Sequence, residues 1–120
     1  MFQSINVKRP PAQDRRERTA ALNRLADALL AMGDRAQMRA LLTDLCTPAE
    51  IEAMADRWQV VAPLLEGVPY REIHERTGVS VTTIGRVARS LTHGAGGYLR
   101  AADALGLKRH PGFTGTASPD

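Results

Sequence analysis

Residues 70–91 read YREIHERTGVSVTTIGRVARSL, and this stretch decides the fold. Its pattern predicts a short helix over residues 70–77, a turn at Gly78 and a second helix over about 81–91. Gly78 accepts the left-handed backbone that such a turn requires. Four apolar side chains have the spacing to fill the elbow between two steeply crossing helices: Ile73, Val79, Ile84 and Val87. The stretch therefore predicts a helix-turn-helix.

The second of these helices has one apolar and one polar face. Its inward positions are Ile84, Val87, Ala88 and Leu91, and Ser80 is placed to cap its beginning. Short hydroxyl and methyl groups at a helix N-terminus can reach base edges in the major groove, whereas arginines bind phosphate. The predicted DNA-contacting residues are Tyr70, Arg71, Ser80, Val81, Thr82, Thr83, Arg86 and Arg89.

Two features of this stretch leave alternatives open. His74 stands where such an elbow commonly has a small residue, and we expect its side chain along the edge of the elbow. A helix pair with a glycine at its turn can also serve packing alone. The alternative to DNA binding is therefore a dimeric helical module that binds a protein partner.

The rest of the chain also predicts helices and no strand. Apolar side chains recur at helical spacing over residues 14–32, 34–45 and 47–66, and a last short helix follows at about 98–105. Pro63 predicts a bend near residues 59–63 or an early end of the central helix. Residues 1–13 are predicted to be a flexible basic arm, which contacts DNA or is merely solvated, and residues 107–120 a disordered tail. The fold class is all-α, with about six helices in one domain over residues 14–106.

Composition narrows the function classes. The chain has 120 residues, 43% of them hydrophobic, and a net charge of +3. A protomer this small buries a limited share of its surface, so dimerisation would be a natural way to bury more. The lone cysteine, Cys46, excludes an intrachain disulfide, and no cluster has the spacing of zinc ligands. We expect no metal, no catalytic set and no membrane span, and a cytoplasmic location.

Several short motifs together resemble one known family. They are LLTDLCTPAE at residues 41–50, Arg57, LLEG at residues 64–67, the 70–91 stretch and GGY at residues 96–98. Over roughly residues 35–105 the chain resembles the Trp repressor superfamily, especially its YerC/YecD-like branch. The resemblance implies an intertwined homodimer that reads palindromic double-stranded DNA and regulates transcription, most often as a repressor.

The resemblance also implies positions for a small ligand. In the repressor, two arginines hold tryptophan between the central helix and the recognition helix, and the matching residues here are Arg57 and Arg86. Thr47 and Ser90 match a threonine and a serine of the same site. The glycine that follows the second arginine in the repressor is Val87 here, which narrows the slot. We therefore do not expect tryptophan as corepressor, and the identity of any small-molecule effector stays open.

Overall fold

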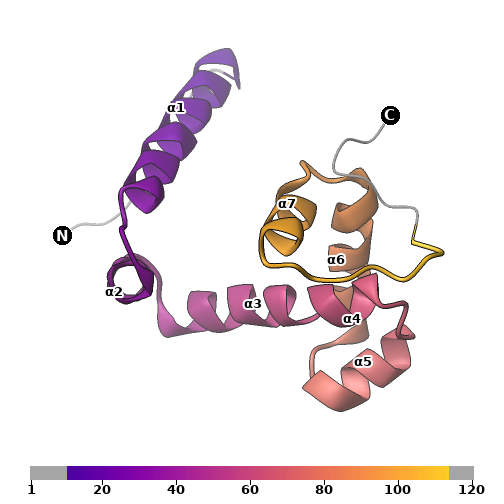
Figure 1. Cartoon of the computed structure of the whole chain (residues 1–120). Coiled ribbons are helices and arrows are strands. Elements are labelled where there is room, and N and C mark those ends of the chain that lie inside the picture. The colour runs from indigo at the N-terminus through magenta and orange to yellow at the C-terminus, as the bar shows by residue number, and fades with distance from the viewer. Residues whose placement is uncertain (1–10, 114–120) are drawn as a thin grey trace. The chain divides into compact units, whose positions relative to one another are not determined.

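The computed structural model describes the chain from residue 11 to residue 113. That part contains seven α-helices and no strand, which confirms the all-α prediction (Figure 1). The chain divides into two compact units, the first ending at Thr47 and the second beginning at Pro48. Residues 1–10 of the predicted arm and residues 114–120 of the predicted tail lie outside the described residues.

The first unit holds α1 (Pro11–Leu30) and α2 (Arg35–Leu45). Helix α1 begins three residues before the predicted start at residue 14, because proline fits the first turn of a helix, where its missing N–H is not needed. Helix α2 begins with a reciprocal cap. The Asp34 carboxylate accepts from the Gln37 backbone N–H at 2.9 Å, and the Gln37 side chain accepts from the Gly33 N–H at 2.7 Å. These bonds satisfy donors that have no partner within the helix.

The apolar side chains of the first unit remain partly or largely exposed. No residue from 14 to 47 is fully buried. Leu22 in α1 is 63% exposed, Leu30 at the end of α1 is 82% exposed, and Leu45 at the end of α2 is 52% exposed. The helical stripes predicted from the sequence are thus present, but within one protomer they form no core.

The predicted central helix is interrupted where the sequence indicates a bend. Helix α3 (Pro48–Gln59) begins at the predicted residue, and α4 (Val61–Leu65) follows after Val60. Pro63 has no N–H to donate to the Gln59 carbonyl, so the regular hydrogen bonding of the helix fails there. This break raises the number of helices from the expected six or so to seven.

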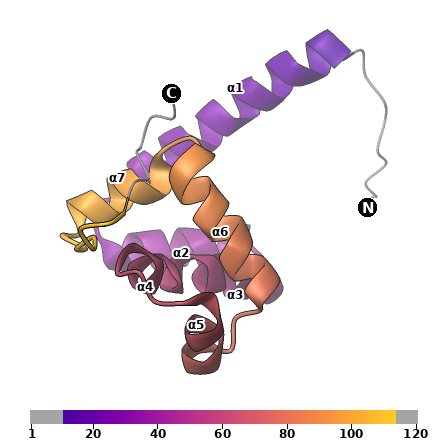
Figure 2. The ribbon, with the colours of Figure 1, turned by 90° about the vertical axis from the view of Figure 1, so that its right-hand side faces the viewer.

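The second unit has a compact aliphatic core around α4. Helices α5 (Tyr70–Thr77), α6 (Val81–His93) and α7 (Gly97–Ala104) all contact α4, and α6 also contacts α5 and α7 (Figures 1 and 2). The buried side chains are Val60, Val61, Leu64, Leu65, Ile73, Val79, Ile84, Val87, Leu91, Leu99 and Ala102. Each buried leucine, isoleucine or valine stabilises the fold by about 1.5–3 kcal/mol.

Residues 107–113, which the sequence predicts to belong to a disordered tail, instead pack on the second unit. The His110 backbone N–H donates to the Leu65 carbonyl at 2.8 Å, and the Leu107 N–H donates to the Ala102 carbonyl at 2.9 Å. Leu107 and Phe113 lie half-buried against the core. The prediction was wrong for this segment because two apolar side chains, one local hydrogen bond and one long-range hydrogen bond outweigh its locally polar, proline- and glycine-containing composition.

Candidate functional site

A dense set of hydrogen bonds holds the turn between α5 and α6. Gly78 adopts the left-handed conformation, with φ 77°, and its N–H donates to the His74 carbonyl at 2.8 Å. The Thr77 hydroxyl donates to the Ile73 carbonyl at 2.7 Å and accepts from the Val79 N–H at 3.1 Å. The two helices and the glycine turn predicted for residues 70–91 are therefore present.

His74 has a structural role that the sequence did not indicate. Its side chain crosses the turn, and Nδ1 lies 2.8 Å from the carbonyl oxygen of Val79. Because a carbonyl can only accept, Nδ1 carries the proton and donates. The imidazole thus ties the last turns of α5 to the residue before the cap of α6. A small residue in its place would leave this bond unmade.

Ser80 caps α6 as predicted. Its hydroxyl oxygen accepts from the Thr83 N–H at 3.1 Å, and the hydroxyl donates to the Thr83 side-chain oxygen at 3.0 Å. Both bonds engage the Ser80 side chain within the helix, so its first role is structural. Val81 and Thr82, which follow, are exposed and have no such engagement among the bonds of the described residues.

Helix α6 has the predicted two faces. Ile84 and Val87 are fully buried and Leu91 nearly so, whereas Val81 is 49% exposed. The predicted phosphate-binding arginines, Arg71, Arg86 and Arg89, are all exposed. Within residues 11–113, none of these three guanidinium groups forms an ion pair.

Tyr70 and Arg89 approach one another over Gly85. A side-chain Cβ placed on Gly85 would lie 3.6 Å from an Arg89 guanidinium nitrogen and 3.8 Å from the Tyr70 ring. Because the glycine has no side chain, the tyrosine ring and the guanidinium both lie close to the helix backbone there. Val81, Thr82 and Arg86 are exposed on the same helix.

The four residues predicted to hold a small ligand are not gathered in one cavity. Ser90 borders a cavity of about 420 Å³ that the glycine-rich segment 94–97 and two aromatic rings also line, but neither Arg57 nor Arg86 lines it. The rings are those of Trp58 and Tyr98, stacked with centroids 6.4 Å apart. Thr47 belongs to the first unit. A ligand held by these residues stays a prediction.

Over residues 11–113, no helix combines the length and apolar character needed to cross a lipid bilayer. The same residues contain no cluster of three or more His, Cys, Asp or Glu side chains arranged to bind a metal ion.

Comparison with known proteins gives consistent matches. The model of the Trp repressor protein family matches residues 20–105. YerC of Bacillus subtilis strain 168, an uncharacterised protein, is 37% identical over 84 residues, which are 70% of this chain and 81% of YerC. The crystal structure of a candidate Trp repressor from Staphylococcus aureus aligns with a TM-score of 0.71 at 35% identity, over 76% of this chain and 91% of that one. A TrpR-like protein from Eubacterium eligens ATCC 27750 aligns with a TM-score of 0.70 at 36% identity, covering 76% and 94%.

Proposed function

The chain belongs to the Trp repressor family, and on that premise we propose that it is a sequence-specific transcription regulator that binds double-stranded DNA as a homodimer. The family is one of DNA-binding regulators and not of enzymes. We propose repression as the outcome, because a dimer seated on an operator blocks access to it. The target is a palindromic site with half-sites one helical turn, about 34–36 Å, or a multiple apart.

The observation that carries the proposal is the division of α6 into a buried and an exposed face. Ile84 and Val87 fix the helix against the core with no exposure, so its outer face is held rigidly. On that face Val81 and Thr82 offer methyl and hydroxyl groups suited to base edges, and the same helix carries Arg86 and Arg89, which form no ion pair within residues 11–113. A rigid helix fits a major groove when short side chains at its N-terminus can contact base edges and arginines beside them can contact phosphates.

The dimer is supported by the apolar surface that one protomer leaves uncovered. Leu22, Leu30 and Leu45 of the first unit are each more than half exposed, and Met54 and Trp58 of α3 are 38% and 36% exposed. Burying apolar surface contributes about 25 cal/mol per Å². A second copy of the chain would bury these side chains and would also give the two-fold symmetry that a palindrome needs.

The test is fluorescence anisotropy with a pool of genomic fragments, followed by binding to selected fragments at several salt concentrations. Affinity is expected to fall steeply as salt rises, because bound cations release counterions from DNA. Arg89→Ala is expected to weaken binding to all fragments alike and to lower the salt dependence by about one counterion per substituted contact. Thr82→Ala is expected instead to change the preference among fragments.

Arg100→Ala serves as the matched control, because Arg100 is an exposed arginine on α7, outside the proposed contact face. Its effect on affinity is expected to be much smaller than that of Arg89→Ala. Equal effects of the two substitutions, or salt-independent binding, would overturn the assignment of α6 to DNA and would favour a helical module that binds a protein.

A further inference from the structure

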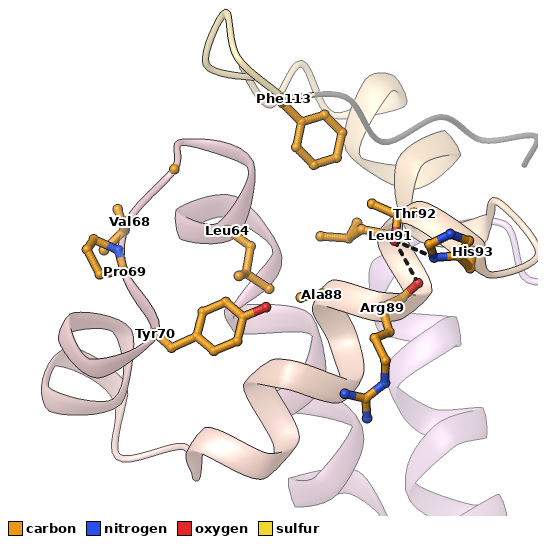
Figure 3. A pocket seen from close by; sticks show the side chains of 11 residues that line it. Leu64, Val68, Pro69, Tyr70, Ala88, Arg89, Leu91, Thr92, His93 and Phe113 are labelled. Carbon is orange, nitrogen blue, oxygen red and sulfur yellow. Dashed lines mark hydrogen bonds between the residues drawn. The ribbon is translucent and has the colours of Figure 1, made fainter.

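A second cavity lies on the flank of α6 that faces α5, and it is larger than the one beside Ser90. Its volume is about 590 Å³, within the range of small-molecule sites. Figure 3 shows that its walls come from separate parts of the second unit: Leu64 of α4, the Val68–Pro69 connection, Ala88 and Leu91 of α6, and Phe113. An apolar body of one ring or a branched chain fits such walls.

The polar groups of this cavity are few, and most of them lie on α6. Arg89, Thr92 and His93 follow one another along α6, and the Tyr70 hydroxyl points toward Leu64 and Ala88 (Figure 3). The Thr92 hydroxyl lies 3.2 Å from the Arg89 carbonyl and 2.9 Å from His93 Nδ1. No Asp or Glu lines the cavity. The electrostatic character of its rim therefore favours an anionic group.

Hydrogen bonds and a ring contact hold Phe113, which forms one wall of the cavity. The segment before it is anchored by the bond from the His110 N–H to the Leu65 carbonyl, and the Phe113 N–H donates to the His110 carbonyl at 3.0 Å. The Arg109 guanidinium lies over the Phe113 ring, 5.7 Å from its centroid, and is held by Asp103 at 2.8 Å. These three hydrogen bonds and one cation–π contact hold this side of the cavity in place.

We propose that this cavity binds a small monocarboxylate with an aromatic or branched apolar body. The apolar body lies between Leu64, Val68 and Phe113. The Arg89 guanidinium lies beside Gly85 and points away from Phe113 in Figure 3, and it turns toward the rim to bind the carboxylate. Arg89 suits this role because its exposed guanidinium has no ion pair within the described residues, so the N–H donors in its plane are available to a carboxylate. This cavity lies on the opposite flank of α6 from Arg86 and Ser90, since those positions are separated from Ala88 and Thr92 by about half a helical turn.

The location predicts what the ligand does, and this step rests on the proposed function. Tyr70 and Arg89 line the cavity and also flank Gly85 on the face proposed to meet DNA. A carboxylate paired with Arg89 withdraws one cation from the phosphate backbone and adds a negative charge beside it. The ligand is therefore expected to weaken DNA binding and so to act as an inducer.

Binding is tested first without DNA, by isothermal titration calorimetry of the full chain with 3-phenylpropanoate. Saturable binding is expected, and the neutral analogue 3-phenylpropanol is expected to bind about tenfold more weakly or worse, because it lacks the charge-assisted bond. Ala88→Leu, which fills the cavity, is expected to abolish binding. Ala104→Leu adds the same side chain at an exposed position of α7, outside the cavity, and is expected to leave binding unchanged.

Circular dichroism of both leucine variants checks that each retains its helices. Should Ala88→Leu unfold, Phe113→Ala removes one wall without adding volume and is expected to weaken binding about tenfold. The proposal is overturned if 3-phenylpropanoate does not bind saturably, if the alcohol binds equally well, or if both cavity variants bind like the unmodified chain.

The effect on DNA is a separate measurement. With a fragment that the protein binds, saturating 3-phenylpropanoate is expected to lower affinity and to reduce the salt dependence by about one counterion per protomer. Binding of the acid with no DNA binding at all would overturn the proposed function and leave the cavity assigned. DNA binding that the acid does not alter, despite calorimetric saturation, would overturn its role as inducer.

Discussion

The two units of the chain use apolar residues in opposite ways. In the second unit, Ile73, Ile84 and Val87 are fully buried by helices of the same protomer. In the first, Leu22 and Leu45 have the same helical spacing, yet each is more than half exposed. Apolar side chains thus recur at helical spacing in both units, but only the second unit has enough elements to cover them. The second unit has a core of its own, and we propose that a second copy of the chain covers the apolar side chains of the first.

We assign different tasks to the two units. A reading helix must be rigid, because a loosely held side chain loses specificity for its base pair. Helix α6 obtains that rigidity from buried contacts within one protomer. Helices α1 and α2 expose their stripes and supply area for association. Stability of the second unit should therefore not depend on protein concentration, whereas order in the first unit should.

The largest expected effect is that of Ile84→Ala, which deletes a fully buried side chain from the core of the second unit. It is expected to lower the free energy of unfolding by about 2–5 kcal/mol. Urea denaturation followed by circular dichroism measures this. Leu22→Ala, the matched change in α1, is expected to cost less than about 0.5 kcal/mol at concentrations where the chain is monomeric. If Ile84→Ala and Leu22→Ala lowered the free energy of unfolding equally under those conditions, the proposed difference between the two units would be wrong.

The next effect concerns association. Leu45→Asp places a charge on the 52% exposed leucine at the end of α2 and is expected to raise the dimer dissociation constant about tenfold to a hundredfold, because each of two copies loses the burial of about half a leucine, about 0.8–1.5 kcal/mol. Sedimentation equilibrium measures it. Thr43→Asp, at an exposed polar position of the same helix, controls for added charge. Unchanged association of Leu45→Asp would exclude this end of α2 from the interface.

A smaller effect comes from a matched pair of helix caps. Ser80→Ala removes the bond to the Thr83 N–H, and Asp34→Ala removes the bond to the Gln37 N–H. Each is expected to cost about 1 kcal/mol. In chemical denaturation, the cost of Ser80→Ala should be the same at all protein concentrations. The cost of Asp34→Ala should appear only at concentrations where the dimer forms, and its presence in dilute solution would show that the first unit is stable by itself.

The smallest effect is expected for His74→Ala, which removes the bond from Nδ1 to the Val79 carbonyl. Because the imidazole is exposed, the expected cost is about 0.5 kcal/mol, at the lower end for a hydrogen bond. Amide hydrogen exchange at residues 77–83 would detect faster opening of the turn, with Glu75→Ala on the same helix as the control. Unaltered exchange would mean that Gly78 and Thr77 alone hold the turn.

The sequence predicts the parts of this fold whose determinants are local. Ile73, Val79, Ile84 and Val87 were predicted to fill the elbow, and all four are buried, because helical periodicity assigns each to an inward face. The break at Val60 followed from Pro63, whose effect reaches only one helical turn. Ser80 was predicted as a cap from residue type and position, and it accepts the expected bond.

Features that depend on distant partners could not be predicted. The His110 N–H finds the Leu65 carbonyl 45 positions earlier in the chain, and no local pattern encodes that pairing. The cavity beside α6 takes its walls from four separate segments, so it exists only after they have packed. Arg89 was predicted to contact phosphate, but the cavity that it borders was not predicted. The role of His74 was missed because its partner lies across a turn.

The turn at Gly78 has a consequence for protein chemistry. No atom outside the neighbouring residues lies within 4 Å of where a Cβ would sit, so volume is not what restricts this position. The restriction is one of chirality, since φ 77° is unfavourable for L-amino acids but favourable for their D enantiomers, whose allowed backbone angles are the mirror images. A semisynthetic chain carrying D-alanine at this position should gain about 0.4–1 kcal/mol from a less disordered unfolded state, whereas L-alanine should lose stability. The chirality of the residue alone would then decide whether one added methyl group stabilises or destabilises the fold.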